Sequence, residues 1–190
     1  MSKELIVFDC FGVICSEVFP IWGKRYFSDE EMKNVKNDII QKSDIGTVTE
    51  KELFNKLSEI TGEDSEKILH DWLGTAVING DMINLIKELK KKYKISLLSN
   101  ASSGFINRIL KRININELFN CIIISSEEGM IKPNKEIFEL MLSKMKVEAS
   151  KSVFIDDNIF NVEGANEVGM TGILFKDIEQ LKKDLSLVLT

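Results

Sequence analysis

The sequence predicts a doubly wound α/β fold with a mainly parallel sheet and an inserted helical segment. Short, continuously apolar runs recur along the chain, and helical patterns alternate with them from about residue 80 onward. By contrast, residues 15–79 contain helical patterns and no convincing strand. Continuous apolar runs suit parallel strands that are covered on both faces, and their alternation with helices favours such a sheet.

Five apolar runs are the expected strands, of which the fifth is the weakest. In chain order they are residues 5–8, 95–98, 121–124, 152–155 and 171–175. Between and after them, apolar residues recur at helical spacing. These sets are Met82, Ile86 and Leu89; Phe105, Ile109 and Ile113; Ile137, Met141 and Met145; and Ile178, Leu181 and Leu185. We therefore expect an α/β core made of residues 1–14 and 80–190.

Residues 15–79 are expected to form an all-helical cap inserted after the first strand. Thr49 and Glu52 have the spacing of a capping box, which predicts the start of a helix. The apolar face of this helix would comprise Leu53, Leu57 and Ile60. Residues 44–48 would form the loop before it.

The composition indicates a globular protein that binds neither nucleic acid nor a membrane. With 190 residues, of which 44% are hydrophobic, the chain can bury one sizeable core. The net charge of −5 is mild, and no basic stripe is interleaved with aromatic residues. The first apolar run is too short for a secretory signal, and Cys10, Cys15 and Cys121 lack the spacing of a zinc site or a disulfide scaffold. We expect a cytoplasmic monomer or homodimer with reduced cysteines.

Polar residues suited to chemistry follow the expected strands. In chain order they are Asp9, Ser99, Asn100, Lys132, Asp156 and Asp157. If the strands are parallel, these side chains gather at one edge of the sheet, where ligand sites lie in open α/β sheets. Each residue alone has a simpler interpretation as a turn, a helix cap or a solvated side chain. Their order along the chain makes the functional interpretation preferable.

This order resembles the haloacid dehalogenase (HAD) superfamily, in which an Asp after a strand is followed by Ser or Thr after a second strand, then Lys-Pro, then Asp-Asp. The last motif is the most specific, because residues 154–165 and 168–170 match the family's final signature almost residue for residue. The resemblance spans nearly the whole chain. It implies a Rossmann-like core with a helical cap and a magnesium-dependent phosphatase that cleaves phosphate monoesters of small metabolites.

The resemblance also implies a role for each residue. Asp9 would be the nucleophile that forms an aspartyl-phosphate, and Lys132 would supply a fixed positive charge. The phosphate-binding residues would be Ser99, Asn100 and Lys132. The ligands of Mg²⁺ would be Asp9, Asp156, Asp157 and the backbone carbonyl of Phe11. Such a cation meets a physical need, since the phosphoryl group is negative and a carboxylate must attack it.

Phe11 departs from the family's pattern, because phosphatases of this family usually carry a second Asp two residues after the nucleophile. General acid–base catalysis typically contributes ~10²- to 10⁴-fold in rate. One alternative is a 2-haloacid dehalogenase, since those members of the family accept an aromatic residue at this position. Against it, Asp156 and Asp157 would repel an anionic substrate unless a cation lay among them. A catalytically weak binding or regulatory protein is the other alternative.

Three further residues lie near the expected site. Cys10 neighbours the nucleophile, but strand alternation directs it to the opposite face, where packing is its expected role. Glu17 and His70 belong to the helical insertion and could replace the missing acid if they reach the crevice. For His70, a surface or packing role is the more common one.

Overall fold

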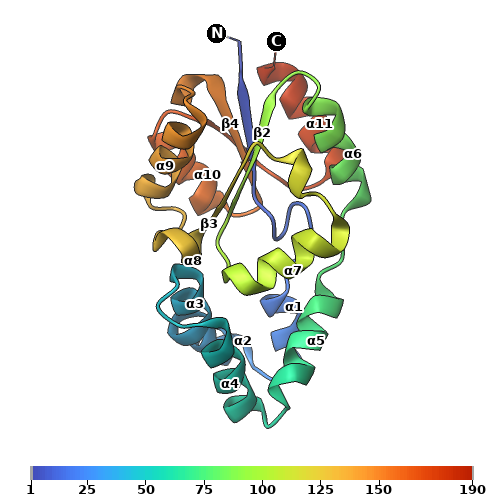
Figure 1. Ribbon diagram of the computed structural model, residues 1–190, viewed down its shortest axis with the longest axis vertical. Helices are drawn as coiled ribbons and strands as arrows, with labels where there is room; N and C mark the ends of the chain where they lie inside the picture. The colour runs from blue at the N-terminus through green and yellow to red at the C-terminus, as the bar shows by residue number, and fades with distance from the viewer. Residues whose placement is uncertain (1, 190) are drawn as a thin grey trace.

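The centre of the molecule is a sheet of five parallel strands, shown by a computed structural model that describes residues 2–189 (Figure 1). The strands are β1 (Leu5–Phe8), β2 (Lys94–Ser99), β3 (Cys121–Ile124), β4 (Ser152–Asp156) and β5 (Thr171–Leu174). Their order is β3-β2-β1-β4-β5, and all neighbouring pairs are parallel. The chain starts in the middle of the sheet and extends it in both directions, so the predicted doubly wound fold is confirmed.

The strands are continuously apolar because helices cover both faces of the sheet. In β1, Ile6 and Phe8 belong to one buried cluster, whereas Leu5 and Val7 belong to another. The helices are α6 (Gly80–Leu89), α7 (Ser103–Ile113), α8 (Ser125–Glu128), α9 (Lys135–Met145), α10 (Ile159–Glu167) and α11 (Ile178–Val188), with short turns η2 (Asn116–Leu118) and η3 (Ala149–Lys151). Helices α6, α7 and α11 contribute to the first cluster, and α9 and α10 to the second.

Helix α10 is not predicted by the sequence, because its buried side lacks an apolar stripe. Its buried residues include Asn161, Gly164 and Ala165. A Cβ atom at Gly164 would lie 2.5 Å from the carbonyl oxygen of Pro133, so the absence of a side chain there allows the close approach. The segment that follows Asp157 therefore packs directly on the segment that carries Lys132.

Residues 19–75 form helices joined by short loops, and these helices lie together on one side of the sheet-containing part (Figure 1). They are α1 (Phe19–Gly23), α2 (Asp29–Val35), η1 (Lys36–Ile40), α3 (Gln41–Ile45), α4 (Glu50–Thr61) and α5 (Ser65–Thr75). A separate hydrophobic cluster around Trp22, Leu57 and Trp72 holds them together. The predicted capping box is present, since Glu52 N–H donates to Thr49 Oγ1 at 3.2 Å and Thr49 N–H to Glu52 Oε2 at 2.8 Å.

Two details of this helical segment correct the sequence prediction. Ile60 is 52% exposed, because Phe54 rather than Ile60 completes the buried face of α4. Asp44 lies in the last turn of α3 and not in a loop. The helix continues to Gly46, whose φ of +85° ends it in the left-handed conformation that favours glycine.

The helical segment is attached to the sheet region on two sides. At its ends, Ser16 N–H donates to Val77 O at 2.9 Å, and Ser16 Oγ–H donates to Thr75 O at 2.7 Å. On another side, the Ser125 hydroxyl at the end of β3 donates to Asp44 O and accepts from Ala101 N–H at 2.9 Å. These contacts hold the helices over the loops that follow β1, β2 and β3.

Two further predictions concern the whole chain. The cysteines are free thiols, of which Cys10 and Cys15 are buried, and Cys10 packs in the core as expected. Across residues 2–189, none of the helices combines the length and the hydropathy needed to cross a bilayer. Met1 and Thr190, the ends of the expected core, lie outside the described residues.

Candidate active site

Asp9 lies at the carboxyl end of the central strand. Its backbone N–H continues the sheet by donating to Ile155 O at 2.9 Å, and Cys10 N–H donates to Asp9 Oδ1 at 2.6 Å. Because Phe8 pairs with Ile155 in the β1–β4 register, the next residues on the two strands are Asp9 and Asp156. Parallel pairing therefore places two carboxylates side by side at one edge of the sheet.

Lys132 is buried and forms ion pairs with both carboxylates. Its Nζ lies 2.8 Å from Asp9 Oδ1 and 2.7 Å from Asp156 Oδ2, and the residue is 2% exposed. Asn100 fixes its backbone with two hydrogen bonds of 2.9 Å, donating from Nδ2 to Lys132 O and accepting at Oδ1 from Lys132 N–H. Burial alone would lower the pKa of Lys132, but the Asp156 and Asp9 carboxylates raise it, so the two carboxylates favour the ammonium form.

Asp156 and Asp157 have different surroundings. Asp156 is fully buried and accepts from Asn158 N–H at 2.8 Å and from Asn161 Nδ2 at 3.1 and 3.0 Å. Asp157 is partly exposed and approaches the loop after β1. Gly12 in that loop has a φ of +79°, and a Cβ there would lie 2.1 Å from Asp157 Oδ2. Glycine at this position is what lets the two loops meet.

Asp9, Asp156 and Asp157 each place a carboxylate oxygen within 4.8 Å of the other two. Within residues 2–189, the Lys132 ammonium forms ion pairs with Asp9 and Asp156, and Asp157 has none, which leaves a surplus of negative charge at a buried place. Burial raises the pKa of Asp9, with Asp156 adding to the rise and Lys132 opposing it, and burial also raises the pKa of Asp157. Oxygen ligands with uncompensated negative charge are the donor set that a hard divalent cation such as Mg²⁺ requires, so the residues fit this ion.

The remaining predicted site residues are Phe11, Ser99 and Asn100. Phe11 follows Asp9, and its carbonyl accepts no backbone hydrogen bond from the described residues. Ser99 ends β2 fully buried, and its Oγ has no hydrogen-bond partner within residues 2–189. Asn100 reaches the pocket, as do Ala101 and Ser102 beyond it.

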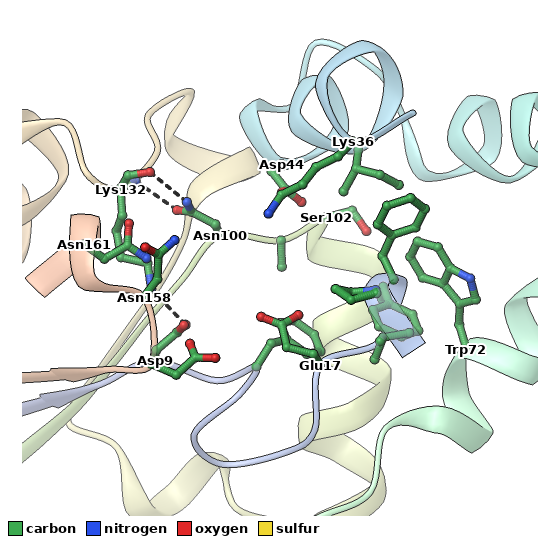
Figure 2. A pocket seen from close by; sticks show the side chains of 18 of the residues that line it. Asp9, Glu17, Lys36, Asp44, Trp72, Asn100, Ser102, Lys132, Asn158 and Asn161 are labelled. Atoms are coloured by element: carbon green, nitrogen blue, oxygen red, sulfur yellow. Dashed lines mark hydrogen bonds and ion pairs between the residues drawn. The ribbon is translucent and has the colours of Figure 1, made fainter. Parts of the chain in front are cut away.

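A pocket of about 160 Å³ opens in front of Asp9 and has two unlike ends (Figure 2). The polar end contains Asp9, Lys132, Asp157, Asn158 and Asn161. The other end is apolar and includes Phe11, Phe19, Trp72 and Phe105. Figure 2 shows Trp72 far from Asp9, at the opposite end of the pocket.

The helical segment also contributes charged groups to the pocket, namely Glu17, Lys36 and Asp44. Burial raises the pKa of Glu17, and the charge on Asp157 adds to the effect. Burial raises the pKa of Asp44 to about 7, with Lys36 opposing the rise and Glu17 adding to it. His70 is exposed on α5 and is not part of the pocket wall, whereas Glu17 is.

Several pocket residues are missed by sequence reasoning. Asn158 and Asn161 follow Asp157 within the most specific motif, so polar side chains one helical turn apart could have identified them. Lys36, Asp44 and Trp72 carry no such signal. They reach the pocket only because the helical segment packs over the strand ends.

Comparisons with known proteins indicate one family for this chain. The family model of haloacid dehalogenase-like hydrolases matches residues 3–169. A D-ribitol-5-phosphate phosphatase of Bacteroides thetaiotaomicron is 24% identical over 200 residues, covering 97% of this chain and 97% of that protein. The sesquiterpene phosphatase astK of Aspergillus oryzae is 31% identical over 97 residues, covering 50% of each. The chain thus spans half the length, or less, of this relative and of several other curated relatives.

A solved structure has the same fold over nearly its full length. The HAD family enzyme bt-2542 of Bacteroides thetaiotaomicron superposes with a TM-score of 0.81 at 22% identity, covering 96% of this chain and 99% of that one. A second structure of that enzyme, in complex with magnesium and inorganic phosphate, gives a TM-score of 0.79 at 23% identity, with coverages of 95% and 99%.

Proposed function

The chain belongs to the haloacid dehalogenase-like hydrolases, and on this premise we propose that it is a magnesium-dependent phosphatase acting on a small phosphorylated metabolite. The observation that carries the proposal is the position of Asp9. It is the carboxylate at the end of the central strand, it faces the pocket, and it is held by Lys132 beside Asp156 and Asp157. This geometry supports nucleophilic attack on a phosphoryl group.

In the proposed reaction, an Asp9 oxygen attacks phosphorus, and the leaving oxygen departs with the electron pair of its bond to phosphorus. Water then hydrolyses the aspartyl-phosphate and regenerates the carboxylate. Lys132 orients Asp9 and supplies positive charge next to the phosphoryl oxygens. Ser99 and Asn100 are proposed to assist phosphate binding, Ser99 through its buried hydroxyl, which has no partner among residues 2–189, and Asn100 by positioning Lys132.

Mg²⁺ would be held by Asp9, Asp157, Asp156 and the carbonyl of Phe11. When bound, this ion supplies the positive charge that three carboxylates and a phosphoryl group require. The carboxylate oxygens of Asp156 accept hydrogen bonds from Lys132 and Asn161, so Asp156 also sets the positions of these two side chains. The magnesium and phosphate in the complex of the bt-2542 enzyme support this assignment.

Residues 15–79 are proposed to act as a cap over a core of residues 1–14 and 80–190. Glu17, Lys36 and Asp44 face the pocket from the helical side, and the hydrogen bonds of Ser16 lie where the chain enters and leaves this segment. Closure of such a cap would exclude water from the nucleophile until the substrate is bound. The name of the D-ribitol-5-phosphate phosphatase, which specifies a small phosphorylated substrate, agrees with an enclosed site.

The test is to trap the phosphorylated nucleophile. Wild-type protein with Mg²⁺ and acetyl phosphate should form an acid-stable, hydroxylamine-sensitive phosphoprotein modified at Asp9. Asp9→Asn should lose turnover by roughly 10³-fold or more while remaining folded. Asp81→Asn, which removes an exposed carboxylate outside the pocket, is the matched control. Turnover of Asp9→Asn at the wild-type rate would refute the assignment.

A further inference from the structure

The apolar end of the pocket is an aromatic wall made of Phe11, Phe105, Trp72 and Phe19. The ring of Phe11 is stacked on that of Phe105, with centroids 6.0 Å apart and planes 15° apart. Trp72 meets Phe105 edge-on at 5.6 Å, and Phe19 lies 6.2 Å from Trp72. Two of these rings come from the sheet region and two from the helical segment, so the wall forms only when both parts are together.

This wall lines the pocket and is not only core packing. Phe105, Trp72 and Phe19 are each less than 10% exposed, yet they line the same pocket as Asp9. The whole pocket, with its polar end included, has a volume of about 160 Å³, whereas an engineered cavity that binds benzene has about 150 Å³. Beside a phosphoryl group, the space therefore admits no more than a single ring.

Phe11 relates the aromatic wall to the choice of leaving group. It is the second residue after the nucleophile, and its phenyl ring contributes to the wall but cannot donate a proton to a leaving oxygen. A phenolate leaves without such help far more readily than an alkoxide, since a phenol such as that of tyrosine has a pKa near 10, against ~15.7 for water. Phe11 thus provides a contact surface for a ring in the leaving group, and an aryl leaving group does not require an acid at this position.

We propose that the enzyme selects phosphate monoesters of single-ring aromatic or heteroaromatic hydroxyl compounds, whose ring lies against the aromatic wall. The proposal rests on the proposed function, because it assumes attack by Asp9 on phosphorus. The Asp9–phosphorus bond forms as the bond from phosphorus to the aryl oxygen breaks, and the aryloxide leaves with the electron pair. Water then releases inorganic phosphate, and its proton neutralises the aryloxide. Lys36, Asp44 and Glu17 are available to polar ring substituents.

Binding of the ring is tested without chemistry by two non-hydrolysable phosphonates of similar size. Phenylphosphonate carries a flat ring, and cyclohexylphosphonate carries a puckered one. In Mg²⁺ buffer, calorimetry on the wild-type protein should show about tenfold tighter binding of phenylphosphonate. Trp72→Leu should remove most of this preference. Trp22→Leu is the matched control, because Trp22 is buried in the same cluster but lies outside the pocket wall.

Phe105→Leu is a second variant in case Trp72→Leu fails to fold, and it should also reduce the preference. The leaving-group requirement is tested with phenyl phosphate and benzyl phosphate, which share a ring but leave as a phenolate and an alkoxide. Phenyl phosphate should turn over at least ~10²-fold faster. Equal affinity of the two phosphonates, or equal turnover of the two esters, would overturn the proposal. The proposed function would survive either result if acetyl phosphate still phosphorylates Asp9. A ring preference without phosphorylation of Asp9 would instead overturn the proposed function, and the substrate proposal that rests on it.

Discussion

Replacing Lys132 with methionine tests the charge arrangement of the site through protein stability. The substitution keeps a long side chain but removes the ammonium that lies within hydrogen-bond distance of both Asp9 and Asp156. Lys132 is 2% exposed, and the two carboxylates are 7% and 0% exposed, so water cannot replace it readily. Removing one partner from a buried ion pair typically costs ~3–5 kcal/mol, because the other charge stays buried without compensation.

For a protein of this size, ~1 kcal/mol lowers the melting temperature by roughly 2–4 °C, so Lys132→Met should lower it by roughly 6–20 °C at pH 7 in metal-free buffer. The free energy of unfolding is measured by urea titration, and the melting temperature by calorimetry. Lys92→Met, which changes an exposed lysine, should stay within ~0.5 kcal/mol of the wild type. Added Mg²⁺ should restore part of the lost stability, because a cation bound to folded carboxylates favours the folded state.

The loss should also depend on pH. Burial already raises the pKa of Asp9 in the folded protein, and removal of Lys132 takes away the main opposing charge. A carboxyl whose pKa is raised by folding binds a proton that the unfolded chain releases near pH 4, so its contribution to stability declines as pH rises. Lys132→Met should therefore be destabilised least near pH 4–5 and most at pH 7. A loss under ~1 kcal/mol at every pH would show that the two carboxylates are not ionised together beside Lys132.

Two other predictions concern the metal and Phe11. Removing Mg²⁺ with EDTA should abolish turnover, and Asp157→Ala should weaken Mg²⁺ binding at least tenfold by calorimetry with little loss of stability, because this carboxylate is partly exposed; full activity without metal would instead favour 2-haloacid dehalogenation. Phe11→Asp should raise turnover of benzyl phosphate by up to ~10²-fold, and more than that of phenyl phosphate, if the new carboxyl protonates the leaving oxygen. Unchanged turnover in a folded, metal-bound variant would mean that the pocket is built for another reaction.

The local pattern of residues determined the core and the order of the reactive groups. The five predicted strands and the four helices predicted for the core lie where the sequence predicts them, because burial on defined faces requires apolar residues at fixed spacing. Parallel strands place their carboxyl ends at one edge, which is why Asp9 and Asp156 could be expected as neighbours. Helix α10 was missed, because small and polar residues form its buried side.

The tertiary structure decided what surrounds the nucleophile. The stacking of Phe11 on Phe105 and the contribution of Trp72 depend on residues far apart in the chain, and no local spacing records them. The hydrogen bond from Ser125 to Asp44 O joins residues separated by 81 positions and helps to place Lys36 and Asp44 over the site. Periodicity states which face of an element is buried but not which other element covers it. The nucleophile could therefore be identified from the sequence, whereas the shape of the pocket, and with it the proposed choice of substrate, followed only from the packing of the helical segment on the strand ends.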